Sequence, residues 1–129
     1  MGDLTRSAYS GGTKINGYSV KRRESFPVWD GGEGAESNHG TKGCPCLVAD
    51  VFGDWREELF LRRSDNRAIR VFMTPEPTAW RFHTFMEDPV YRISVATENC
   101  GYNVPPEPGF YFGPELLGHG VRFRGAVVK

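Results

Sequence analysis

The sequence has little of what several protein classes require. Its 129 residues include only three cysteines, too few for the disulfide framework of a small secreted scaffold. Its longest apolar runs fall far short of the roughly 18 residues that a membrane-spanning helix needs, which excludes a transmembrane protein. It sustains no heptad and its glycines follow no fixed period, which excludes a coiled coil and a collagen-like chain. These absences predict a soluble chain of one domain or less.

The chain also has no excess of charge of either sign, because it contains 16 Lys and Arg and 16 Asp and Glu. A protein dedicated to nucleic acid carries an excess of cations, since it gains affinity by releasing counterions from phosphates. We therefore expect no nucleic-acid partner and no membrane partner. Residues 1–6 contain no apolar core of a secretion signal, so no signal peptide is visible in the chain.

Aromatic residues make up 13% of the chain, enough apolar area for a packed core, which excludes a disordered protein. Nine of the 16 glycines fall in residues 1–46, so we predict that this segment consists mainly of loops. Its one local signal is Asn16-Gly17, where both residues tolerate the positive φ angles of a type I′ turn. This signal predicts a hairpin that joins Thr13–Ile15 to Tyr18–Val20.

Residues 47–129 predict a β unit. Short β-branched or aromatic runs are separated by turn residues such as Gly53-Asp54 and Ser64–Asn66. The four runs are Leu47–Ala49, Glu58–Arg62, Ala68–Met73 and Ala79–Phe85. Four short strands in about 40 residues is the spacing of one β-propeller blade or of half a sandwich. The predicted fold class is therefore all-β.

One short helix is predicted near Asp88–Asn99, because an aspartate suited to the N-cap is followed by a proline suited to the first helical position. The Val, Ile and Thr content of this segment leaves a strand through Arg92–Thr97 as the competing prediction. Three prolines in Asn103–Gly109 predict an exposed loop, because proline cannot donate to a strand ladder. The alternating run Val121–Arg124 is typical of an edge strand.

The segment from Asp50 to Glu58 has the carboxylate spacing of a calcium-binding loop. Asp50, Asp54 and Glu58 stand at loop positions 1, 5 and 9, and the backbone carbonyl of Arg56 stands at position 7. Because Ca²⁺ prefers six to eight oxygen ligands, this spacing predicts a calcium site. Position 3 is Phe52, which supplies no side-chain oxygen. The alternative is an ordinary charged turn between two strands.

A polar loop, His39-Gly40-Thr41-Lys42, precedes the first of these strands. A lysine here neutralises an acidic substrate or, if desolvated, acts as a base; the alternative is a solvated surface lysine. His39 is ambiguous in the same way. Tyr102 follows the predicted helix and is either a hydroxyl donor at the rim of a site or a packing residue.

The spacing of Cys44, Cys46 and Cys100 does not fit a zinc site. Two alternatives stay open for them: a disulfide from Cys44 or Cys46 to Cys100, or small buried hydrophobic side chains. The sequence contains no phosphate-binding loop, dinucleotide fingerprint or nucleophile elbow, so it gives no support to a nucleotide site or a serine hydrolase.

Several segments, in order and with similar spacing, carry a resemblance to one known family. They are Asn38–Lys42, Ala49–Glu58, Ala68–Val71, His83–Arg92, Gly101–Asn103 and Pro105–Gly113. The most specific are Gly-Asp-Trp-Arg-Glu-Glu, in the second segment, and Asp-Pro-Val-Tyr-Arg, in the fourth. Together they resemble the C-terminal part of family 11 polysaccharide lyases, which are rhamnogalacturonan lyases.

This resemblance implies a fold, a reaction and a set of site residues. Such lyases form an eight-bladed β-propeller with bound calcium, and the chain resembles only the C-terminal blade and its flanking segments. By the resemblance, Lys42 and Tyr102 are catalytic, His39, Gly40 and Thr41 bind substrate, and the Asp50–Glu58 loop binds Ca²⁺. His39 stands where the family usually has asparagine. The implied partner is an acidic plant cell-wall polysaccharide, and the implied location is secreted or cell-surface.

The implied reaction is β-elimination in the rhamnose–galacturonate backbone of pectin. It needs a cation beside the uronate carboxylate, a base at C5 and an acid at the O4 leaving group. Lys42 suits the first two roles, and Tyr102 suits a donor or a positioning group. Three interpretations stay open: a piece or shortened homologue of a lyase, a non-catalytic pectin-binding module, and an inactive structural fragment. A lone blade leaves apolar faces uncovered, so we also expect self-association.

Overall fold

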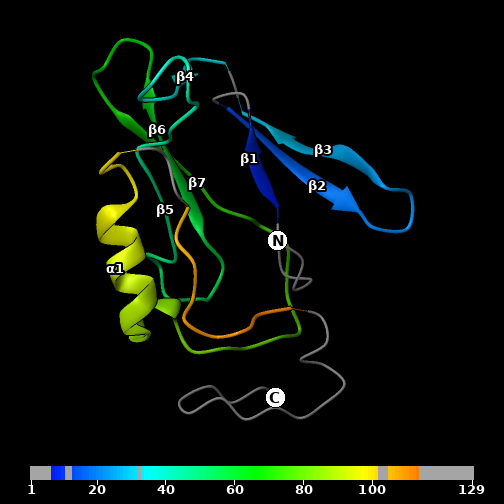
Figure 1. Ribbon diagram of the computed structural model, residues 1–129. Coiled ribbons are helices and arrows are strands. Elements are labelled where there is room, and N and C mark those ends of the chain that lie inside the picture. Colours follow the sequence, from blue (N-terminus) through cyan, green and yellow to red (C-terminus); the bar gives the residue numbers. More distant parts are fainter. Residues whose placement is uncertain (1–6, 11–12, 32, 102–104, 114–129) are drawn as a thin grey trace.

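The computed structural model describes residues 7–10, 13–31, 33–101 and 105–113, which form two antiparallel sheets and one short helix (Figure 1). The N-terminal sheet has the order β1-β2-β3. Its strands are β1 (Ala8–Ser10), β2 (Lys14–Ser19) and β3 (Glu24–Asp30). The segment predicted to consist mainly of loops therefore also contains a three-stranded sheet, which the prediction did not include.

The predicted hairpin at Asn16-Gly17 is wrong. Both residues lie inside β2, which is paired on both sides, and the turn between β2 and β3 comes later, with Arg23 at a φ of 56°. Gly17 serves close packing instead, because a Cβ built on it would lie 2.6 Å from the Phe26 ring. The dipeptide tolerates a tight turn, but the pairing of its neighbours on both sides decides against one.

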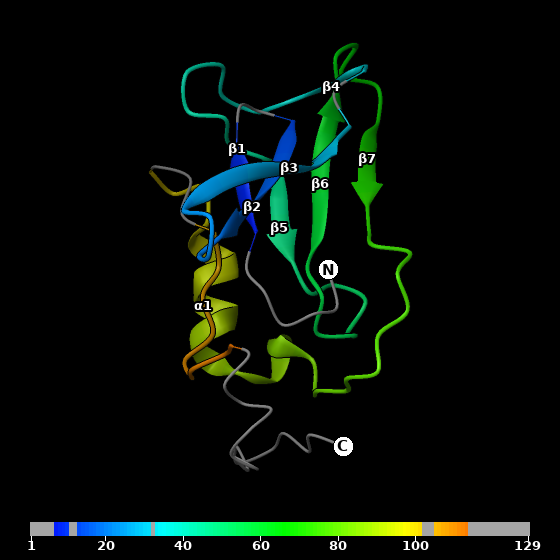
Figure 2. The ribbon, with the colours of Figure 1, turned by 90° about the vertical axis from the view of Figure 1, so that its right-hand side faces the viewer.

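The second sheet is built around β6 (Glu58–Arg63), which pairs with three shorter strands. These are β4 (Ala35–Glu36), β5 (Leu47–Ala49) and β7 (Ile69–Phe72). Three of the four predicted strands are thus confirmed. Leu59 and Leu61 alternate onto the buried face of β6, where they pack with Ala35 against side chains of the N-terminal sheet. Figure 2 shows β3 crossing in front of β6.

The fourth predicted strand, Ala79–Phe85, is wrong. Residues 79–84 form no strand, and Thr84 caps a 3-10 helix, η1 (Phe85–Glu87). The aromatic side chains of this segment belong to a core cluster rather than to a sheet face. Trp55, Phe85 and Tyr91 are its buried members, and Trp80, Phe82, Met86, Val95, Phe110 and Phe112 pack against them. The aromatic residues of this segment, which suggested a strand, are therefore explained by their packing in the core cluster.

The predicted helix is confirmed as α1 (Pro89–Thr97), and the competing strand is wrong. The Asp88 side chain caps it by accepting a hydrogen bond from the Val90 N–H at 3.0 Å, and Pro89 occupies the first turn. Helix α1 lies beside β5 (Figures 1 and 2). Described residues 105–109 form no helix or strand, as expected, whereas residues 103–104 and the predicted edge strand Val121–Arg124 lie outside the described residues.

No helix in the described ranges has the length and apolar character that would let it cross a membrane. The three cysteines are free thiols: Cys44 is buried, Cys46 is half-buried and Cys100 is exposed. Of the two alternatives for the cysteines, the structure excludes the disulfide and makes only Cys44 a buried side chain. The described part of the chain is thus mostly strands with one short α-helix, and two separate apolar clusters hold it together.

Candidate functional site

The predicted polysaccharide-binding residues lie together on one exposed turn. His39 and Cys44 face each other in an isolated bridge, the Asn38 N–H donates to the Cys44 carbonyl at 2.7 Å, and the Gly43 N–H donates to the His39 carbonyl at 3.0 Å. Gly43 has a φ of 62°, in the left-handed region that favours glycine. We call His39–Lys42 the exposed turn.

The side chains of the exposed turn face solvent. His39, Gly40, Thr41 and Lys42 are all exposed, and a Cβ added to Gly40 would meet no described atom within 4 Å. Thr41 Oγ1 lies 3.1 Å from His39 Nδ1, so the hydroxyl and the imidazole share a hydrogen bond. The turn therefore offers a cation and polar groups to a ligand. Tyr102 lies outside the described residues, and its approach to Lys42 stays a prediction.

The loop from Asp50 to Glu58 holds two carboxylates away from solvent. Asp50 is fully buried; its Oδ2 accepts a hydrogen bond from the Phe85 N–H at 2.8 Å. Glu58 is 2% exposed, and its Oε2 accepts from the N–H groups of Val51 and Phe52, at 2.9 and 3.0 Å. Burial raises the pKa of Glu58 against the effect of these two bonds, and the charges of Asp50 and Asp54 raise it further.

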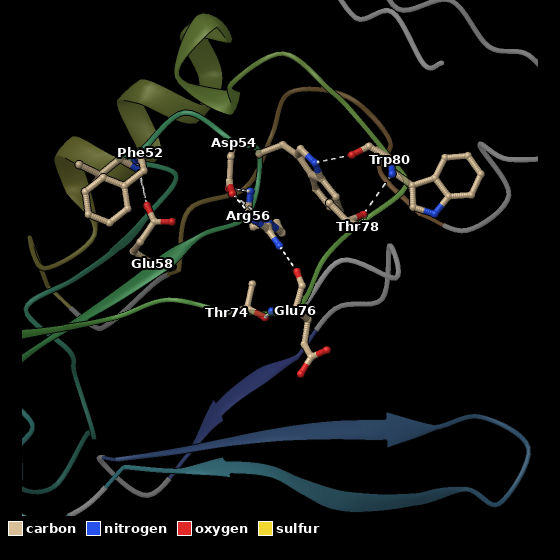
Figure 3. A network of polar contacts seen from close by, with 10 residues as sticks. Phe52, Asp54, Arg56, Glu58, Thr74, Glu76, Thr78 and Trp80 are labelled. Carbon is tan, nitrogen blue, oxygen red and sulfur yellow. Dashed lines mark hydrogen bonds and ion pairs between the residues drawn. The ribbon is translucent and has the colours of Figure 1, made fainter.

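Asp54 was expected to bind a metal ion, but it forms an ion pair with Arg56. Its carboxylate contacts the Arg56 guanidinium through both Nε and Nη2, and it also accepts from the Arg56 N–H at 3.1 Å (Figure 3). The guanidinium donates in addition to the Glu76 carbonyl at 2.6 Å. Burial alone raises the pKa of Asp54, but the hydrogen bonds and charge of Arg56 outweigh it and lower that pKa. Sequence reasoning used only the Arg56 carbonyl and missed this ion pair.

The structure therefore fits the predicted calcium site in part. Among the described residues, no three His, Cys, Asp or Glu side chains gather closely enough to hold a metal ion, so Asp50, Asp54 and Glu58 do not converge as expected. One observation does favour a cation: Asp50 Oδ1 is buried and has no hydrogen-bond partner among the described residues. An unpartnered buried carboxylate oxygen is costly unless a positive charge reaches it. Asp50 and Glu58 thus suit Ca²⁺, whereas Asp54 in this arrangement does not.

Tyr91 supports this loop, a role that the sequence predictions did not assign to it. It belongs to the first turns of α1 and is fully buried. Its hydroxyl accepts from the Asp50 N–H at 2.9 Å and donates to Glu57 Oε1 at 2.8 Å. Burial, followed by the charge of Glu57, raises the pKa of Tyr91, so the hydroxyl keeps its proton. The specific motif Asp-Pro-Val-Tyr-Arg contains this tyrosine, which was the one available signal.

A third buried carboxylate, Glu98, lies at the C-terminal end of α1. It is 2% exposed, and its two oxygens lie 3.2 and 3.0 Å from the Val48 N–H, which donates to them. Burial raises the pKa of Glu98 to about 7 against the effect of the Val48 hydrogen bond, and the charge of Glu57 adds to the rise. Glu98 therefore ties the helix end to β5.

Comparison with known proteins decides the family. A model described as "Rhamnogalacturonan lyase family 11, C-terminal domain" matches residues 1–120. The chain belongs to this family. The match includes the first 35 residues, which lie outside the segments that carried the resemblance. Rhamnogalacturonan endolyase YesW of Bacillus subtilis (strain 168) is 49% identical over 80 residues, and rhamnogalacturonan exolyase YesX of the same organism is 50% identical over 80 residues.

These family 11 lyases are much longer than this chain. The alignments cover 62% of the chain but only 13% of YesW or YesX. Solved structures agree with this relation. A rhamnogalacturonan lyase PL11 from Bacillus licheniformis has a TM-score of 0.81 at 39% identity, and YesW has a TM-score of 0.82 at 40% identity. Each comparison covers 88% of this chain and 19% of the solved one.

Proposed function

We propose that the chain acts as part of a rhamnogalacturonan lyase, which cleaves the rhamnose–galacturonate backbone of pectin by β-elimination. The observation that carries the proposal is the family match over residues 1–120. We further propose that the second sheet is one blade of a β-propeller, and that the exposed turn lines one side of the polysaccharide cleft. The ligand is then an acidic plant cell-wall polysaccharide, which calls for secretion or display at the cell surface.

The chemistry of the exposed turn supports this role. Abstraction of the C5 proton leaves negative charge beside the uronate carboxylate, so a nearby cation stabilises the transition state. Lys42 is exposed on the turn and suits that neutralisation, or proton abstraction once the cleft excludes water. The exposed backbone at Gly40 and the hydroxyl of Thr41 suit hydrogen bonds to sugar hydroxyls. We assign Tyr102 to the leaving group or to its positioning, and His39 to a sugar contact.

The calcium proposal is narrower than the spacing of the loop suggested. Asp50 and Glu58 would hold Ca²⁺ together with backbone carbonyls, and the ion would supply the positive charge that Asp50 Oδ1 lacks. Its role there is structural, because the loop connects β5 to β6. Arg56 and Asp54 would brace the far side of the loop through their ion pair.

Polysaccharide binding tests the functional proposal directly. Calorimetry with oligosaccharides of alternating rhamnose and galacturonate should give binding heat with the parent chain. Lys42→Ala should weaken binding about tenfold, as expected for loss of one charged contact, with an unchanged melting temperature. Lys21→Ala is the matched control, because it removes an exposed lysine from the turn between β2 and β3. Equal losses of affinity in the two variants would show that only net charge matters, and would overturn the proposal that the exposed turn binds the polysaccharide.

Catalysis by the chain alone is not expected. The chain spans a small part of the length of known lyases, and a cleft built from several blades would be incomplete. Mixed with rhamnogalacturonan and calcium, it should bind without growth of the ultraviolet absorbance of unsaturated uronate. Growth that Lys42→Ala abolishes would show that the chain is a sufficient catalytic unit. Binding without turnover also agrees with the alternative of a pectin-binding module, in which the exposed turn contacts the polysaccharide without catalysis.

Calcium titration tests the metal proposal. Asp50→Asn keeps the shape of the side chain but replaces a carboxylate oxygen by an amide, so it should abolish the calcium-dependent rise in melting temperature. In a chelator, the variant should be at least as stable as the parent, because a buried charge has been removed. Asp54→Asn is the control and should keep most of the calcium response. A parent chain without any calcium response refutes the site.

Self-association follows from the exposed apolar side chains of β7. Ile69 and Val71 are 60% and 44% exposed, and they alternate onto the face away from the core of the second sheet. We propose that the chain associates through this face. Sedimentation should show a concentration-dependent rise in mass, which Val71→Lys should reduce; a parent that stays monomeric contradicts the proposal.

A further inference from the structure

The arm that leaves the exposed turn, Pro45–Val48, is fixed by two consecutive residues at the end of α1. Asn99 Nδ2 donates to the carbonyls of Pro45 and Cys46, at 3.4 and 3.1 Å. One residue earlier, the buried Glu98 carboxylate accepts from the Val48 N–H. Three backbone groups of four successive residues are therefore held by the helix end.

The same arm is joined to the other side of the turn. Asn38, which directly precedes His39, donates through Nδ2 to the Pro45 carbonyl at 3.2 Å. Its Oδ1 accepts from the Cys46 thiol at 3.2 Å. The Pro45 carbonyl is thus shared by two amides, one from the helix end and one from the arm that enters the turn. Pro45 itself is fully buried, whereas the exposed turn that precedes it faces solvent.

We propose that Asn99 is a positioning residue, which sets the orientation of the exposed turn toward the polysaccharide through the Pro45 carbonyl. The proposal rests on the function assigned above to the turn. Asn99 itself touches no residue of His39–Lys42 in any hydrogen bond that the described residues show. It acts through Pro45–Val48, and the buried Glu98 carboxylate holds the same segment by its hydrogen bond to the Val48 N–H.

The physical reason lies in the ordering of a flexible segment. Gly40 lies in the exposed turn and Gly43 directly follows it, and glycines give a backbone many accessible conformations. A ligand that binds only one of these conformations loses the conformational entropy of the others. Bonds that fix both arms at their base reduce that cost before the ligand arrives. Removing Asn99 should therefore weaken binding without unfolding the chain, because the side chain is exposed and packs in neither core cluster.

The variants follow from the contacts. Asn99→Ala removes both carbonyl bonds, and Asn99→Gln keeps the donating amide on a longer arm, for which the exposed position leaves room. Thr97→Ala is the matched control: Thr97 Oγ1 bonds only carbonyls within α1, those of Ile93 and Ser94, among the contacts described. All three variants should melt within a few degrees of the parent.

Two measurements on the 129-residue chain separate the outcomes. Hydrogen exchange of the Asn38 and Gly43 amides should become about fivefold faster in Asn99→Ala, but not in Thr97→Ala. Affinity for the rhamnose–galacturonate oligosaccharide should fall about fivefold in Asn99→Ala and recover in part in Asn99→Gln. Unchanged exchange overturns the positioning role even if affinity changes. A parent that does not bind the oligosaccharide overturns the proposed function instead, and exchange then still decides whether Asn99 fixes the turn.

Discussion

The hydroxyl of Tyr91 gives the sharpest test of how the helix supports the Asp50–Glu58 loop. Tyr91→Phe removes one oxygen and leaves the ring in place among Phe85 and its other apolar neighbours. The variant loses two hydrogen bonds at once: the buried Asp50 N–H loses its acceptor, and Glu57 loses a donor. Because the ring keeps its packing, the change in stability reports these two bonds.

The expected cost follows from the burial of Asp50 and from the charge of the exposed Glu57. An unpartnered buried N–H costs about 1–3 kcal/mol, and a hydrogen bond to a charged group contributes about 1.5–3 kcal/mol. Glu57 has further interactions and regains part of its loss, so we expect a total of about 2–4 kcal/mol. For a chain of this size that corresponds to a fall in melting temperature of about 10 °C.

Urea denaturation followed by tryptophan fluorescence measures this cost, since Trp55 belongs to the same cluster as Tyr91. Tyr18→Phe is the matched control, because Tyr18 is 58% exposed and its variant should unfold within about 0.5 kcal/mol of the parent. If Tyr91→Phe also falls within about 0.5 kcal/mol, the hydroxyl does not hold the loop and the reasoning fails.

Two further predictions concern a pH response and close packing. Burial raises the pKa of Glu98 to about 7 in the folded chain, so the free energy of unfolding should fall as pH rises from about 5 to 7. In urea titrations at pH 5 and pH 8, Glu98→Gln should show a smaller fall than the parent, and equal falls would contradict the role of Glu98 in the pH response. A Cβ on Gly31 would lie 1.8 Å from the Trp29 ring, which packs on Phe72, so Gly31→Ala should lower the free energy of unfolding by about 1–3 kcal/mol. Gly40→Ala, where a Cβ meets no described atom within 4 Å, should change it little, and equal losses in urea denaturation would show that the Trp29 ring moves freely.

Local chemistry in the sequence was enough to predict several elements. The runs that became β5, β6 and β7 carry β-branched or aromatic residues between turn residues, and this pattern acts over a few neighbours. The start of α1 is equally local, because Asp88 caps the helix through a residue two positions away. The motifs that carried the family resemblance are also contiguous, so they needed no fold to be recognised.

Other features were decided only by partners far away in the chain. Asn16-Gly17 has the composition of a tight turn, but Asn16 pairs with both β1 and β3, and Gly17 pairs with β3, so the dipeptide lies within a strand. The aromatic run Ala79–Phe85 has the composition of a strand, but its rings fill a cluster with Trp55 and Phe112. In both segments, pairing or packing with distant residues outweighs the local conformational preference of the sequence.

The candidate site shows the same division. Sequence alone determined the family, the loop that carries Asp50 and Glu58, and the polar turn around Lys42, because each is a contiguous pattern of residue types. Only the tertiary structure revealed that Asp50 is held by Tyr91, 41 residues away, and Pro45 by Asn99, 54 residues away. A hydrogen bond depends on distance and direction in space, and residues so far apart meet only after the sheet and helix have packed.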